Sequence, residues 1–123
     1  MSDRPTRVMC VDDNEGIGES IQRILRRHTD LAWAGWLATA SGLAGEVDSR
    51  DPDVLLLDID IPGEDPFDAL ASLAEARPEV RVIMLSGHVR AEYIDRALAA
   101  GAWGYISKND ETDSIVSAIR QAM

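Results

Sequence analysis

Short runs of apolar residues alternate along the chain with longer segments whose apolar residues recur at helical spacing. The runs have the length and the aliphatic content of buried strands, so they predict five strands. Three of them are apolar without interruption, which is typical of strands covered on both faces of a sheet. The predicted strands are residues 7–11, 31–37, 54–57, 80–85 and 103–106.

The segments between these runs predict five amphipathic helices. Asp65 followed by Pro66 is typical of an N-cap with proline at the first helical position, and Gly101 is typical of a helix end. The helices are predicted at residues 17–28, 41–49, 66–77, 91–100 and 112–121. Caps are expected at Ser41, at Asp65 and at Thr112 or Asp113.

Strands that alternate with helices predict an α/β fold in which helices cover both faces of a parallel sheet. The chain has 123 residues, of which 46% are hydrophobic and 28% are charged, so it can bury a core of its own. We find no internal repeat and no linker-like tract. The sequence therefore predicts one domain over residues 1–123.

The charge balance limits the partners of this domain. Its net charge of −10 argues against direct binding to nucleic acid, which needs clustered basic residues. No apolar stretch has the length of a membrane span, and no signal peptide is recognisable, so we expect a cytoplasmic location. Cys10 is the only cysteine, which excludes an intrachain disulfide, and its apolar neighbours predict that it is buried.

Polar residues follow four of the predicted strands. The carboxyl ends of parallel strands meet at one edge of the sheet, where ligands bind near the point at which the strand order reverses. Each residue alone has a structural explanation as a turn, a cap or a surface charge. Their combination, which includes the only lysine in the chain, favours a site. The residues are Asp12, Asp13, Asp58, Asp60, Ser86 and Lys108.

The chemistry of this group is that of phosphoryl transfer to a carboxylate. Two carboxylates about 4 Å apart repel each other by roughly 4 kcal/mol at an effective dielectric constant near 20. Clustered acids therefore have a raised pKa or bind a cation, and oxygen ligands with open positions suit Mg²⁺. A carboxylate can accept a phosphoryl group, whose charge a divalent cation, an ammonium and a hydroxyl would neutralise.

Four segments resemble the signature blocks of response regulator receiver domains, which are CheY-like. They are VDD at 11–13, LDIDIPG at 57–63, LSG at 85–87 and GAWGYISK at 101–108. They stand in the family's order, and the resemblance covers essentially the whole chain. Asn109 stands where many receivers have proline, which is similar to the NarL/FixJ branch with its LuxR-type outputs. The resemblance implies a flavodoxin-like (βα)5 three-layer sandwich with strand order 2-1-3-4-5.

The resemblance also implies a role for each site residue. Asp58 matches the phosphoacceptor, Lys108 the lysine that pairs with the phosphoryl group, and Ser86 and Tyr105 the switch hydroxyl and the switch aromatic. The ligands of Mg²⁺ would be Asp12, Asp13, Asp58 and the backbone carbonyl of Asp60, with Asp13 binding directly.

The implied function is a phosphorylation-dependent switch of a two-component system. A sensor histidine kinase would supply the phosphoryl group, and the surface of the fourth helix, the fifth strand and the fifth helix would change to control an output, expected to be transcription. The domain would be no enzyme beyond its own phosphotransfer and autodephosphorylation. No output domain is expected within this chain, so a helix-turn-helix output would lie outside it, and the family allows a homodimer through the first and last helices.

Two other readings remain open at this point. A degenerate receiver would act by protein binding without phosphorylation, and Mg²⁺-dependent binding of beryllofluoride would exclude it. A haloacid-dehalogenase-like phosphatase also uses an Asp-x-Asp pair, similar to Asp58 and Asp60. That fold places the pair after its first strand and needs a longer chain, and turnover of a phosphate ester would reveal it.

Overall fold

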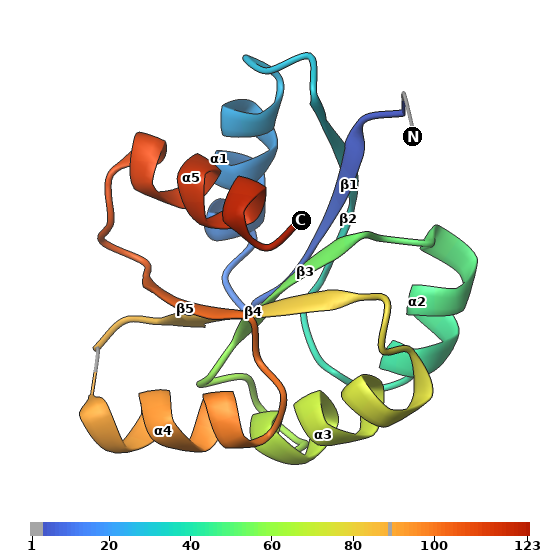
Figure 1. Ribbon diagram of the computed structural model, residues 1–123, viewed down its shortest axis with the longest axis vertical. Coiled ribbons are helices and arrows are strands. Elements are labelled where there is room, and N and C mark those ends of the chain that lie inside the picture. Colours follow the sequence, from blue (N-terminus) through green and yellow to red (C-terminus); the bar gives the residue numbers. More distant parts are fainter. Residues whose placement is uncertain (1–3, 89) are drawn as a thin grey trace.

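The computed structural model describes residues 4–88 and 90–123, in which five strands and five helices alternate. The helices α1 and α5 cover one face of the sheet, and α2, α3 and α4 cover the other (Figure 1). The elements are β1 (Thr6–Val11), α1 (Glu15–Leu25), β2 (Leu31–Leu37), α2 (Leu43–Arg50), β3 (Val54–Asp58), α3 (Pro66–Ala76), β4 (Arg81–Ser86), α4 (Ala91–Ala99), β5 (Gly104–Ser107) and α5 (Thr112–Gln121).

The sheet is parallel throughout and has the order β2-β1-β3-β4-β5, which confirms the expected flavodoxin-like topology. The chain runs outward from β1 to β2 and then returns to β3 on the other side of β1, so the strand order reverses between β1 and β3. Val11 at the end of β1 pairs with Leu57 near the end of β3. Asp12, which directly follows β1, and Asp58, the last residue of β3, therefore emerge side by side.

Two hydrophobic layers form the core, one on each face of the sheet. Successive residues of a strand point to opposite faces, so Leu55 and Leu57 pack toward α2, α3 and α4, whereas Leu56 packs toward α1 and α5. All five residues of β3 are buried. Burial on both faces explains why the central strands are apolar without interruption.

The predicted helix boundaries are confirmed for α3 and α5, whereas α1 begins and ends earlier than the predicted residues 17–28, and the predicted caps of α2 and α5 are wrong. The side chain of Asp65 accepts a hydrogen bond from the backbone N–H of Phe67, as expected of an N-cap. The N-cap of α2 is Gly42 rather than Ser41, because this position has a left-handed backbone with φ of 69°, which favours glycine. The N-cap of α5 is Glu111, because the helix already begins at Thr112.

The three tryptophans differ in burial. The sequence predicts that Trp33, Trp36 and Trp103 are packing residues, with the alternative that Trp103 faces a partner. Trp33 and Trp36 pack against the cluster on the α1 and α5 face, which confirms the expectation for them. Trp103 is 55% exposed, so it is not a core residue, and its exposure fits the alternative that it faces a partner. It lies just before β5, and the guanidinium carbon of Arg81 stands 3.8 Å from its ring centroid.

Cys10 is fully buried, as predicted. Burial, assisted by the negative charge of Asp12, raises the pKa of its thiol to about 12, so the thiol stays protonated near neutral pH. Among the described residues, no helix has both the length and the hydropathy that crossing a membrane requires.

The turn after α4 generates a prediction about stability. Gly101 has φ of 110°, and a Cβ built on it would stand 2.9 Å from the Cβ of Ala74. Gly101→Ala should therefore lower the free energy of unfolding by roughly 1–3 kcal/mol. Gly45→Ala is the matched control, because Gly45 lies in α2 with nothing within 4 Å of such a Cβ. It should raise the free energy by about 0.5–1 kcal/mol. Urea unfolding checks both, and equal effects would contradict this account of the turn.

Candidate functional site

Asp12 follows β1 directly, and both its backbone and its carboxylate are held in place. Its backbone N–H donates to the carbonyl of Leu37 at 2.9 Å, and its own carbonyl accepts from Nε1 of Trp36 at 2.7 Å. Its Oδ1 accepts from the backbone N–H of Asn14 at 2.8 Å. Asn14 in turn caps α1. The segment after β1 is thus ordered into the first turn of the helix.

Asp58 is the last residue of β3, and its side chain has no exposed surface. Its Oδ1 accepts a hydrogen bond from the backbone N–H of Asp60 at 3.0 Å. The next residue, Ile59, donates its N–H to the carbonyl of Leu85 on the neighbouring strand. This bond continues the pairing between β3 and β4 and fixes the direction in which the Asp58 carboxylate leaves the sheet.

Lys108, the only lysine of the chain, brings its ammonium group to these two carboxylates. Its backbone N–H donates to the carbonyl of Ser86 at 2.8 Å, which places the residue at the end of β5 next to β4. Its Nζ lies 2.7 Å from Oδ2 of Asp12 and 3.1 Å from Oδ2 of Asp58. The lysine therefore bridges two fully buried acids that come from different strands.

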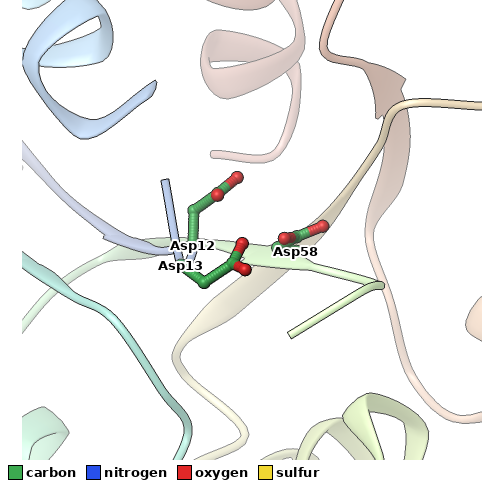
Figure 2. Close-up of side chains that lie close together, drawn as sticks. All are labelled: Asp12, Asp13 and Asp58. Atoms are coloured by element: carbon green, nitrogen blue, oxygen red, sulfur yellow. The ribbon is translucent and has the colours of Figure 1, made fainter. Parts of the chain in front are cut away.

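Asp13 completes a cluster of three carboxylates. One oxygen each from Asp12, Asp13 and Asp58 lies within 4.8 Å of the others. Figure 2 shows the three side chains at the ends of β1 and β3, with the carboxylate of Asp13 directed toward Asp58. Asp12 and Asp58 are buried, whereas Asp13 is exposed, so the cluster opens to solvent on one side. Oxygen donors at this separation with an open side fit a hard divalent cation that keeps part of its water shell.

The electrostatics favour a cation at this site. Burial is the largest cause that raises the pKa of Asp58, and the negative charge of Asp12 adds to it, against the opposing effects of the Asp60 N–H and Lys108. Burial lowers the pKa of Lys108, but the two acids more than offset this, and the net shift is upward. Lys108 therefore stays protonated, and one ammonium faces three carboxylates. The remaining negative charge is what a divalent cation would balance.

Ser86 lies beside the cluster, but its hydroxyl is engaged elsewhere. It is the last residue of β4, with 1% of its surface exposed. Its Oγ donates to the backbone carbonyl of His88 at 2.6 Å and accepts from the His88 N–H at 3.1 Å. Both bonds tie the hydroxyl to the loop that leads from β4 to α4, not to Asp58.

Tyr105 and Asp60 are the other two predicted site residues. Tyr105 pairs with Met84 in the sheet, and its ring packs against the core on the α2–α4 face. Its hydroxyl is buried and has no hydrogen-bond partner within residues 4–88 and 90–123. The side chain of Asp60 is exposed, and only its backbone N–H contacts Asp58.

Sequence reasoning missed two groups that shape the site. The sequence predicts no site role for Trp36, yet its indole N–H donates a hydrogen bond to the carbonyl of Asp12. Its position opposite Cys10 in the β1–β2 register places it next to the acid pair, but no sequence pattern reveals where its N–H points. The backbone of His88 holds the Ser86 hydroxyl, and a backbone partner cannot be predicted from the type of residue at that position.

Comparison with known proteins shows which family the chain is similar to. The family model described as response regulator receiver domain matches residues 8–120. The chain is 36% identical to the transcriptional regulatory protein MctR of Rhizobium johnstonii, over 97% of this chain and 56% of that protein. It is 37% identical to a protein-glutamate methylesterase/protein-glutamine glutaminase of Nitrobacter winogradskyi, over 93% of this chain and 27% of that protein.

The fold also resembles a solved receiver. The signal receiver domain of the response regulator NarL from Mycobacterium tuberculosis superposes with a TM-score of 0.87 at 26% identity, covering 95% of this chain and 94% of that one. This similarity agrees with the expected NarL/FixJ branch. The chain spans only about half of MctR and about a quarter of the methylesterase.

The buried bridge generates a prediction about Lys108. In chelator-treated protein, Lys108→Met should lower the free energy of unfolding at pH 7 by roughly 3 kcal/mol, because it leaves two buried carboxylates without their counter-charge. The loss should shrink as the pH falls, because the raised pKa of Asp58 lets protonation remove one of these charges. Arg120→Met is the control, because its pair with Asp30 is exposed and should contribute far less. Urea unfolding at several pH values checks both, and equal losses in the two variants would contradict the bridge.

Proposed function

Because the chain belongs to the response regulator receiver family, we propose that Asp58 accepts a phosphoryl group from the phosphohistidine of a sensor histidine kinase. The chain is a receiver domain, not a conventional enzyme, and its pocket of acids and Lys108 is typical of a phosphorylation-dependent switch. The observation that carries the proposal is the Lys108 ammonium between the buried carboxylates of Asp12 and Asp58.

In the proposed reaction, a carboxylate oxygen of Asp58 attacks the phosphorus of the phosphohistidine. A P–O bond forms and the P–N bond breaks, and the histidine nitrogen leaves with the electron pair of that bond. The product is an acyl phosphate on Asp58. The domain would position the reacting groups and neutralise the charge of the phosphoryl group, the two effects that dominate catalysis of phosphoryl transfer.

We assign Mg²⁺ to the acid cluster, where the carboxylates of Asp12, Asp13 and Asp58 and the backbone carbonyl of Asp60 would hold it, with Asp13 as the direct ligand of the acid pair. When bound, the ion would neutralise negative charge on the phosphoryl oxygens. Lys108 supplies the second positive charge. Its Nζ lies 3.1 Å from Asp58 and can remain paired with Asp12 while it turns toward a phosphoryl oxygen.

The switch would start at Ser86. Phosphorylation adds roughly −1.5 to −2 units of charge and three acceptor oxygens next to its hydroxyl. A hydrogen bond from Ser86 to one of these oxygens would break its bond to the His88 carbonyl and release the loop before α4. Tyr105 would respond on the neighbouring strand, and the surface of α4, β5 and α5 would shift between two states.

We further propose that the output is transcription, through a LuxR-type helix-turn-helix segment outside this chain, with a second copy as a partner. The similarity to MctR, a transcriptional regulatory protein, supports this output. The similarity to the methylesterase shows that related receivers also belong to proteins with another output. A degenerate receiver is less consistent with the site, because every acid and the lysine are present and gathered.

Phosphorylation of Asp58 can be tested directly. Incubation with phosphoramidate and Mg²⁺ should add one phosphoryl group, seen by intact-protein mass spectrometry and lost on treatment with hydroxylamine, as expected for an acyl phosphate. Asp58→Asn should remain unlabelled, whereas Asp68→Asn, which changes an exposed acid on α3, should label like the wild type. Normal labelling of the Asp58 variant would refute the assignment.

The role of Ser86 gives a separate prediction. Ser86→Ala should still accept the phosphoryl group, but amide resonances of α4 and β5 should move much less on phosphorylation, because the loop loses its link to the phosphate. Ser86→Thr keeps the hydroxyl and should retain most of the change. NMR spectra of ¹⁵N-labelled protein with and without phosphoramidate provide the measurement. A full spectral change in Ser86→Ala would exclude the serine as the link.

A further inference from the structure

We propose that Trp36 is a positioning residue that holds the Asp12–Asp13 peptide group, and thereby the Asp13 carboxylate, at the place where a divalent cation binds. The inference rests on the proposed function, because it concerns the cation assigned to the acid cluster. It extends that function to a residue on β2, outside the segments that resemble the family signature.

The indole of Trp36 fixes one side of this peptide group. Its Nε1–H donates to the carbonyl oxygen of Asp12 at 2.7 Å, a short and well-formed hydrogen bond. The N–H of the same Asp12 donates to the carbonyl of Leu37 at 2.9 Å. The strand β2 therefore holds Asp12 through the peptide groups on both of its sides, once by backbone and once by the tryptophan side chain.

The ring itself is held between β2 and α1. A Cβ added to Gly18, which is buried in α1, would lie 2.7 Å from Cδ1 and 2.9 Å from Cγ of Trp36. The ring thus fits against a helix position that only a glycine leaves open. Because α1 begins at Glu15, shortly after the acid pair, one indole lies against both the acid pair and the first turns of the helix that follows it.

Asp13 depends on this support more than Asp12 does. The carboxylate of Asp12 has its own partners in Lys108 and the N–H of Asn14. The Asp13 side chain is exposed and, within the described parts of the chain, makes no hydrogen bond or ion pair. The Asp12 carbonyl and the Asp13 nitrogen belong to one planar peptide group. Fixing that carbonyl therefore fixes the backbone from which the Asp13 carboxylate extends.

The test is a Mg²⁺ titration of the whole chain, followed by isothermal calorimetry and by the indole ¹⁵N–¹H resonances of the three tryptophans. Disappearance of one resonance in Trp36→Phe assigns that signal. In the wild type, this resonance should move as Mg²⁺ binds, while those of Trp33 and Trp103 should stay. Trp36→Phe keeps most of the ring but loses the donor, so it should weaken Mg²⁺ binding roughly three- to tenfold. Trp33→Phe, on the same strand, should bind like the wild type.

Gly18→Ala is an independent variant that keeps the indole and displaces it. It should also weaken Mg²⁺ binding, and the double variant with Trp36→Phe should bind no more weakly than Trp36→Phe alone, because both act through one hydrogen bond. Unchanged Mg²⁺ affinity in Trp36→Phe or in Gly18→Ala, or an equal loss in Trp33→Phe, would overturn the inference and leave the proposed function intact. A wild type that binds no Mg²⁺ would overturn both.

Discussion

The structure depends on an ammonium group held between two carboxylates that have no access to solvent. The parallel register of β1 and β3 brings Asp12 and Asp58 to adjacent strand ends, and Lys108 enters from the end of β5 to bridge them. Such an arrangement is costly unless each charge is paired and hydrogen-bonded. Backbone N–H groups of Asn14 and Asp60 satisfy the remaining carboxylate oxygens, so the site is ordered before any ligand arrives.

The same bridge leaves part of the negative charge at the site unbalanced, so the site can respond to a ligand. One lysine does not balance three acids, so under the proposed function a divalent cation would bind first and a phosphoryl group would follow. The Ser86 hydroxyl, which would respond to a phosphoryl group, already has another hydrogen-bond partner. Ser86 is bound to the backbone of His88, which stands three residues before α4 in the sequence. A change of partner at Ser86 thus has a short path to the surface of the domain.

Much of the fold and site could be predicted from the sequence because the informative features are local or periodic. Uninterrupted apolar strands such as residues 54–57 predict a parallel sheet, and the residues that follow strands predict where Asp58 and Lys108 meet. Other features depend on backbone geometry. The left-handed cap at Gly42 and the exposure of Trp103 follow from how the chain turns. The hydrogen bond of Trp36 follows from side-chain direction, which residue identity does not encode.

The most direct test of the central claim is binding of beryllofluoride, a mimic of the phosphoryl group, followed by ¹⁹F NMR. If the acids, the lysine and a divalent cation act as one pocket, protein-bound fluoride resonances should appear with Mg²⁺ present and vanish with a chelator or in Asp58→Asn. Bound resonances that persist in Asp58→Asn, or none at all in the wild type with Mg²⁺, would contradict the account.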